Sequence, residues 1–216
     1  NGKVTVKYAK ENPNLTFKGN GNVELIPSSD DQKSIEIKTN SLINGPVQIT
    51  VPKTVTQIII DSVSLESITD SITSISAKTT NTASVNLTIK NIDAKENSKS
   101  RINDITIEDS LKVAQTAVVT IKNTNLSSAK INYNIDDFSS WNKPSILGTF
   151  SSLPDEFIIN KNGNSPKNDV DYSLIEGTFD GITCNEWLEK VEMKNTGLNS
   201  KRCDDFKIIQ ESENKR

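Results

Sequence analysis

The stretch VNLTIKNI, residues 85–92, alternates apolar and polar side chains and then breaks that alternation at Lys90 and Asn91. Period-two alternation is typical of a β-strand with one buried face. A similar polar break follows the apolar runs that end at Ile60 and Ile107. In a coiled β array the polar residues would lie at a corner, and the next apolar residue would return to the core. The sequence therefore predicts a unit made of a strand, a polar corner and a further core position.

This unit recurs along the chain. Alternating runs begin at residues 23, 35, 47, 58, 72 and 85, which are 11 to 14 residues apart, and they resume at residues 105, 119 and 131. Asn-Gly and other polar pairs between the runs are turn signals. The chain of 216 residues contains 26 Ile, 13 Val and 20 Thr, whose branched side chains favour strands over helices. A near-constant period indicates one supersecondary unit used repeatedly in an all-β protein.

Two all-β architectures fit this period. In a β-solenoid, or β-helix, short strands from successive coils pair in parallel, whereas a β-sandwich packs two sheets face to face. Hydrophobic residues are 33% of the chain and aromatic residues 5%, which favours the thin core of a solenoid and leaves the sandwich as the alternative. In the solenoid, Glu36, Thr88, Thr106 and Thr120 should point outward. The residues expected to point into the core are Ile35, Ile37, Ile58, Ile60, Leu87, Ile89, Ile105, Ile107, Val119 and Ile121.

The pattern divides the chain into three parts. Residues 1–138 are predicted to form the repetitive β domain. Residues 139–182 contain aromatic residues and Pro, and we expect an irregular segment packed on the array. Residues 183–216 are expected to form a C-terminal helical cap.

The predicted helix has clear start and stop signals. Thr183 and Glu186 have the spacing of a capping box. Trp187, Leu188 and Val191 then share one helical face, and a glycine at position 197 is placed to end the helix. A helix that buries its tryptophan over the last coil would cap the open end of a solenoid.

One stretch resembles a known repeat. Residues 51–68, VPKTVTQIIIDSVSLESI, resemble one repeat of the BspA-type leucine-rich surface proteins, without the Ala-Phe and Cys positions of that repeat. The Ile, Thr, Asn and Ser content is similar to that of β-helical adhesins of microbial surfaces. Both resemblances imply an extracellular solenoid with a binding or structural role.

Cysteine and asparagine usage also favours an extracellular location. Cys184 and Cys203 are the only cysteines and flank the predicted helix, which suggests a disulfide; two buried free thiols are the alternative. Triplets of the form Asn-x-Ser/Thr, the acceptor sequence for N-glycosylation, begin at Asn14, Asn86 and Asn125.

Several classes of site have little support in the sequence. The chain has no His, a net charge of −3 and no apolar run of membrane-spanning length, so we expect no triad, metal, cofactor, nucleic-acid site or membrane span. Adjacent acidic residues occur at 30–31, 136–137, 155–156 and 204–205, in sequence typical of turns. An outward Thr at the centre of five strands could build a flat ladder, although Thr is an ordinary solvent-facing strand residue. These are Thr5, Thr50, Thr88, Thr106 and Thr120.

The sequence therefore predicts a binding, adhesion or surface-structural protein without catalytic activity, secreted or at the cell surface. Its expected partner is a host protein, a glycan or another copy of itself. Trp141, Phe150 and Phe157 are the candidate ligand contacts if they are exposed, because irregular segments on a rigid scaffold often carry binding residues. For these residues the alternative is that they are buried and only pack the core, as large apolar side chains usually do. The alternative is a carbohydrate-binding or polysaccharide-degrading β protein, which a groove lined by aromatic and acidic residues would favour.

Overall fold

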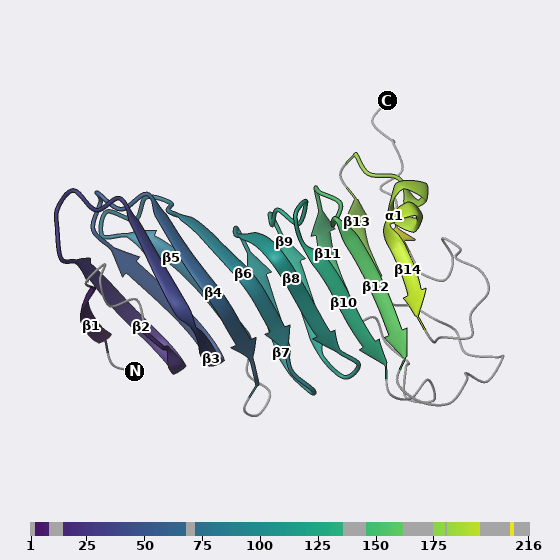
Figure 1. Cartoon of the computed structure of the whole chain (residues 1–216), viewed down its shortest axis with the longest axis horizontal. Coiled ribbons are helices and arrows are strands. Elements are labelled where there is room, and N and C mark those ends of the chain that lie inside the picture. The colour runs from purple at the N-terminus through teal and green to yellow at the C-terminus, as the bar shows by residue number, and fades with distance from the viewer. Residues whose placement is uncertain are drawn as a thin grey trace.

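The fold is all-β and its strands pair in parallel. The computed structural model describes residues 3–8, 15–67, 72–135, 146–161, 175–179, 181–194 and 208–209. Within these ranges the strands form one 15-stranded sheet, and every pairing between named strands is parallel (Figure 1). The predicted parallel pairing is thus confirmed, and the antiparallel sandwich is wrong for the described strands.

The strands fall into an N-terminal group and two ladders. The N-terminal group is β1 (Lys3–Tyr8), β2 (Lys18–Pro27) and β3 (Ser34–Val51). One ladder contains β4 (Gln57–Leu65), β6 (Asn86–Ala94), β8 (Thr106–Ala114), β10 (Lys130–Ile135), β12 (Glu156–Lys161) and β14 (Val191–Lys194). The other contains β5 (Thr73–Thr79), β7 (Lys99–Asn103), β9 (Val118–Lys122), β11 (Ile146–Phe150), β13 (Ile175–Phe179) and β15 (Ile208–Ile209).

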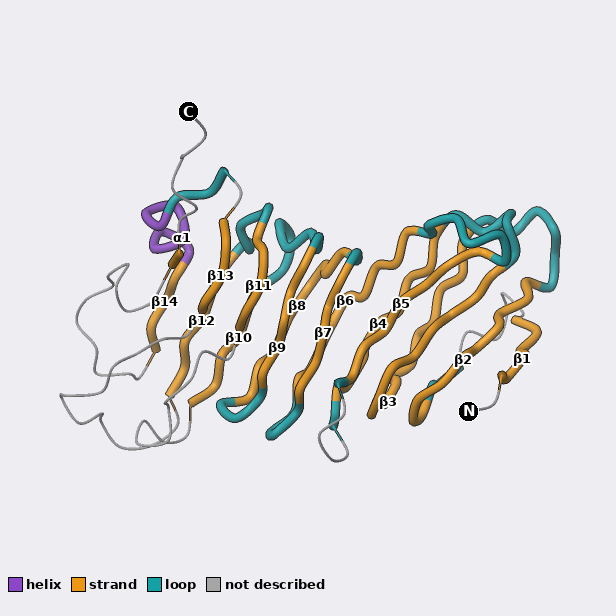
Figure 2. The backbone as a smooth tube through the Cα atoms, turned by 180° about the vertical axis from the view of Figure 1, so that it is seen from behind, coloured by secondary structure: helices purple, strands orange, loops and turns teal. Residues whose placement is uncertain are grey.

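The long strand β3 joins the two ladders. Its first part pairs with β4 and its last part pairs with β5, so each later strand stacks on the next but one in the sequence. The Asn-Gly pair at 44–45 was expected to be a turn, but β3 passes through it without interruption. The strand stays extended here because the neighbouring strand β2 pairs with β3 on both sides of this point. Figure 2 shows the two ladders advancing together from the N-terminal strands.

The predicted polar corners are present as bends in the ladder. The register between β3 and β4 shifts between Ile37 and Asn40, and the register between β6 and β8 shifts between Ile89 and Asn91. Such a shift is the mark of a β-bulge, which bends a strand and redirects its side chains. The apolar residue after each corner returns to the core, as Ile92 does with an exposure of 1%. This part of the sequence prediction is confirmed.

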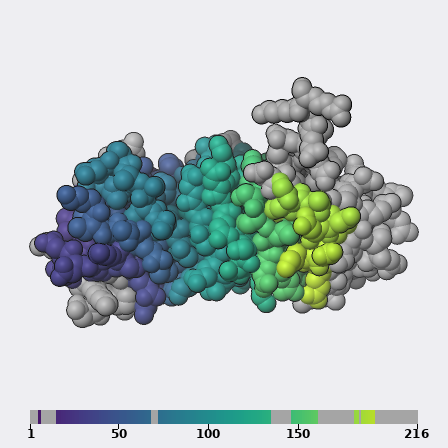
Figure 3. Space-filling view, turned by 90° about the horizontal axis from the view of Figure 1, so that it is seen from above, coloured from purple at the N-terminus to yellow at the C-terminus, as the bar shows by residue number. Residues whose placement is uncertain are grey.

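The core is a narrow stack of aliphatic side chains between the ladders. All ten residues that the sequence placed there are buried, and the four outward residues are partly exposed. The body is correspondingly elongated, with the N-terminal strands at one end and the helix α1 (Cys184–Lys190) near the other (Figure 3). Because most contacts join strands that are neighbours within one ladder, stability is distributed along the body.

The segment 139–182, which was predicted to be irregular, contains regular strands. The structure places β11, β12 and β13 in it, and these strands extend both ladders. In β11 the alternation is less regular in sequence because Gly148 stands at the inward position between Ile146 and Phe150, where an aliphatic residue would be expected. The rest of the segment lies outside the described residues, apart from two short stretches at 151–155 and 181–182.

The C-terminal helix is present but short. Helix α1 (Cys184–Lys190) begins at the predicted cap, where Glu186 N–H donates to Thr183 Oγ1 and Thr183 N–H donates to the Glu186 carboxylate at 2.7 Å. It ends before the predicted stop near residue 197. Val191 is the first residue of β14, where it pairs with Phe157, so ladder hydrogen bonds replace helical ones. Trp187 is buried as expected, with 2% exposure.

Candidate functional site

The aromatic residues proposed as ligand contacts belong to the core. Phe150 and Phe157 are 1% and 0% exposed, and each packs edge-on against Trp187. For these two residues the alternative of core packing holds, because their strands place them on inward positions of the ladders. Trp141 lies outside the described residues. Ile72, 44% exposed, is the one large hydrophobic side chain that the described part of the chain leaves exposed.

The five threonines do not form one ladder. Thr88 pairs with Thr106, but Thr120 lies in the other ladder beside Arg101 and Leu147. Thr5 and Thr50 are separated by Glu24 on β2, which pairs with both. The sequence shows that each threonine faces outward but not which strand lies next to it.

The acidic pairs are scattered. Asp30 and Asp31 lie in an exposed turn, and the pairs at 136–137 and 204–205 lie outside the described residues. Asp155 and Glu156 line a shallow hollow that also contains Glu189, Lys190 and Glu192. Among the described residues, no group of three or more His, Cys, Asp or Glu side chains is arranged to hold a metal ion. The described residues also include no helix with the length and hydropathy of a transmembrane segment.

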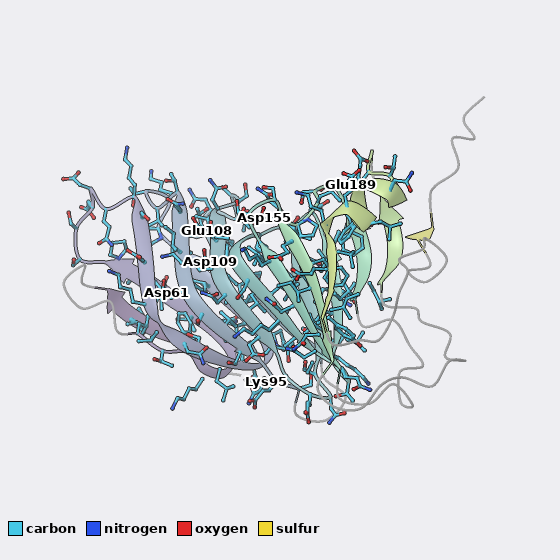
Figure 4. All side chains as sticks on the ribbon, turned by 45° about the vertical axis from the view of Figure 1, so that its right-hand side comes forward. Asp61, Lys95, Glu108, Asp109, Asp155 and Glu189 are labelled. Carbon is cyan, nitrogen blue, oxygen red and sulfur yellow. The ribbon has the colours of Figure 1, made fainter. Side chains whose placement is uncertain are left out.

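Charged side chains meet at one corner of the array. The Nζ atom of Lys90 lies 3.2 Å from the Asp61 carboxylate and 3.8 Å from that of Glu36, which joins strands β3, β4 and β6. The hydrogen bond to Asp61, together with the negative charges of Asp61, Glu36 and Glu108, raises the pKa of Lys90 above its ordinary value. Figure 4 shows Asp61 on β4, with Glu108 and Asp109 further along the body on β8. The ion pairs of Lys90 with Asp61 and Glu36 therefore link three neighbouring strands at the corner, and the raised pKa keeps the lysine charged.

A polar groove on another part of the described surface is a candidate binding site. It has a volume of about 350 Å³ and lies across β2, β3 and β5. Outward side chains align across these strands, since Asn22 pairs with Gln48 and Gln48 pairs with Ser76. Pro46 and Ser74 form a second row beside the first. The full lining is Asn20, Gly21, Asn22, Pro46, Val47, Gln48, Ser74 and Ser76.

Three glycines shape this groove. The register between β2 and β3 shifts between Gly19 and Gly21, which have φ angles of 96° and 124°. These positive values favour glycine, so the bulge depends on it. On β3, a Cβ atom at Gly45 would lie 3.0 Å from the side chain of Asn20, so the missing side chain leaves room for that amide. Asn20 also donates a hydrogen bond of 3.4 Å to Asn44 Oδ1.

The sequence alone does not reveal this groove. The only sequence feature that marks the groove is the pair of stretches rich in Asn and Gly at 19–22 and 44–45, and such stretches are normally interpreted as turns. Only lateral pairing brings the two stretches together. None of the lining residues is aromatic or acidic, so this groove lacks the lining that would favour the carbohydrate-binding or polysaccharide-degrading β protein named as the alternative.

The structure describes some of the residues predicted to carry N-glycans or to form the disulfide. Asn86 and Asn125 are exposed, and Asn14 lies outside the described residues. Cys184 begins α1, while Cys203 lies outside the described residues, so the disulfide stays a prediction. Comparisons with protein-family models, with curated proteins and with solved structures found no match for this chain.

Proposed function

We propose that this chain is a β-solenoid that acts outside the cell, or on its surface, as a binding or surface-structural protein without catalytic activity. The observation that carries the proposal is the alignment of outward side chains over successive parallel strands, from β2 to β5 on one side and from β3 to β8 on the other. A rigid array of this kind presents a fixed polar surface, and binding area can be gathered from several strands at once.

The character of the surface supports recognition by polar contacts. The large aromatic side chains of β11, β12 and α1 are buried, and Ile72 is the only large hydrophobic side chain that is exposed in the described residues. An interface on such a surface would use hydrogen bonds and charge pairs more than apolar anchors. The two cysteines and the acceptor triplets support an oxidising, extracellular location.

The solenoid architecture has a direct test in solution. A compact protein of this length would have a radius of gyration of about 17 Å. Small-angle X-ray scattering should give a larger value and a distance distribution with a long tail. A radius near the compact value would contradict the elongated solenoid.

The function is tested with the whole chain. Immobilised mucin, laminin and collagen are the first probes, and analytical ultracentrifugation measures self-association in parallel. Saturable binding to one of these surfaces, or concentration-dependent assembly, is the expected result. A screen for release of reducing sugars from soluble polysaccharides runs beside it. Turnover of any of them would contradict the non-catalytic role, and a monomer that binds no surface would contradict the proposal as a whole.

A further inference from the structure

The groove across β2, β3 and β5 contains no charged side chain, although the chain as a whole has 25 Lys and Arg and 28 Asp and Glu. Its polar lining consists of amides from Asn20, Asn22 and Gln48 and hydroxyls from Ser74 and Ser76. An ionised ligand would find no counter-charge among these residues. Amides and hydroxyls can both donate and accept hydrogen bonds, which matches a ligand whose groups also do both.

The polar groups of the groove are available for a ligand. Within the described part of the chain, the side chains of Asn22, Gln48, Ser74 and Ser76 make no hydrogen bond to another residue. Gln48 and Ser74 are half-buried, while Asn22 and Ser76 are exposed. Only Asn20 is held in place, by its hydrogen bond to Asn44 Oδ1. Its side chain occupies the space that a Cβ atom at Gly45 would need.

The geometry of the groove favours an extended ligand. Neighbouring strands of a sheet are about 4.8 Å apart, so Asn22, Gln48 and Ser76 present polar groups at regular intervals along a line. An extended peptide would instead add to a free sheet edge or fill apolar pockets. Here the backbone of β3 is already paired with β2 on one side and with β5 on the other.

From these observations we propose that the groove binds a neutral polysaccharide chain through its hydroxyl groups. This inference rests on the proposed binding function and names the ligand class for one surface of the array. Pro46, which is exposed beside the second row, offers the apolar surface that the C–H groups of a sugar ring would contact.

The experiment is affinity electrophoresis of the whole chain in native gels that contain soluble mannan, laminarin, hydroxyethylcellulose or polygalacturonate. At least one of the three neutral polysaccharides should retard the protein in a concentration-dependent manner. Gln48→Ala should weaken the apparent affinity about 3- to 10-fold, because a side-chain hydrogen bond is lost. The Gly45→Ala variant, which would displace Asn20, should weaken it as well.

The matched control is Gln57→Ala. Gln57 is also a half-buried glutamine at an outward strand position, but it lies on β4, away from the groove. This variant should keep the affinity of the unmodified chain. Thermal unfolding of all three variants shows whether a loss of retardation reflects unfolding.

Three outcomes would overturn the inference. One is retardation by none of the neutral polysaccharides. Another is retardation by polygalacturonate alone, which would direct attention to Arg101, the cation that follows Ser74 in the same row on β7. The third is equal loss of affinity in Gln48→Ala and Gln57→Ala. Binding to mucin, laminin or collagen that persists in any of these cases would show that the proposed function stands while the groove inference fails.

Discussion

The indole ring of Trp187 on α1 lies edge-on to the ring of Phe150 on β11, with 5.6 Å between centroids and an angle of 81° between planes. Phe157 on β12 makes a similar contact from the other ladder, at 6.1 Å. The tryptophan thus closes the core between the two ladders near the C-terminal end. Edge-to-face pairs of this kind add to the free energy gained from burying the rings.

Replacing this tryptophan should therefore weaken the C-terminal end of the array. We expect Trp187→Ala to lower the free energy of unfolding by about 3–5 kcal/mol, as for other large side chains removed from a core. Urea unfolding followed by circular dichroism gives the value. Leu188→Ala is the control, since Leu188 is only partly buried, and its effect should be smaller. Equal effects of the two changes would contradict the packing seen here.

A second prediction concerns the close approach of β11 to β9. Gly148 has a φ of 142°, and a Cβ atom built there would lie 1.8 Å from the carbonyl oxygen of Ile121. Gly148→Ala should lower the free energy of unfolding by more than about 2 kcal/mol, because backbone must move to relieve the contact. Thermal or urea unfolding measures the loss.

Gly181 provides the comparison for this glycine. It also has a positive φ, 71°, but an added Cβ would meet nothing within 4 Å. Gly181→Ala should lower stability by only about 1 kcal/mol, the strain of the left-handed region alone. If the two substitutions had the same effect, the steric argument for Gly148 would fail.

The capping box gives a prediction for acid pH. Hydrogen bonds from the backbone N–H and the hydroxyl of Thr183 lower the pKa of Glu186 below its ordinary value. A carboxylate with a lowered folded-state pKa contributes stability above its unfolded pKa of about 4.3, and this contribution is lost as pH falls through the folded value.

Unfolding of the unmodified chain and of Glu186→Gln between pH 2 and pH 7 tests this linkage. The unmodified chain should be the more stable of the two at pH 7, and the difference should narrow as the pH falls below about 4.3. A difference that stays constant over the whole range would show that the carboxylate charge has no part in the cap.

The predicted disulfide can be tested by mass. Alkylation with iodoacetamide in denaturant should leave Cys184 and Cys203 unmodified, and prior reduction should allow two adducts. Because the bridge would close a loop of about 20 residues, its loss in a Cys203→Ser variant should lower stability by about 3 kcal/mol. Two adducts without reduction would remove the disulfide and weaken the case for an extracellular location.

Much of this architecture is already determined by the sequence. Alternation of branched aliphatic and polar residues specifies the strands and their inward side chains, as at Ile58 and Ile60 on β4. The polar break after Ile89 specifies a corner, and the spacing of Thr183 and Glu186 specifies a helix start. Each of these features depends on residues a few positions apart, so the local sequence is sufficient to determine it.

The tertiary structure alone decided which residues become neighbours. The groove exists because β2 and β5 flank the last part of β3, and Asn22, Gln48 and Ser76 are 26 or 28 residues apart in the chain. The helix stops at Lys190 because Val191 pairs with Phe157, 34 residues earlier. Strand alternation fixes the side that a residue faces, whereas lateral register depends on hydrogen bonds and packing between distant segments.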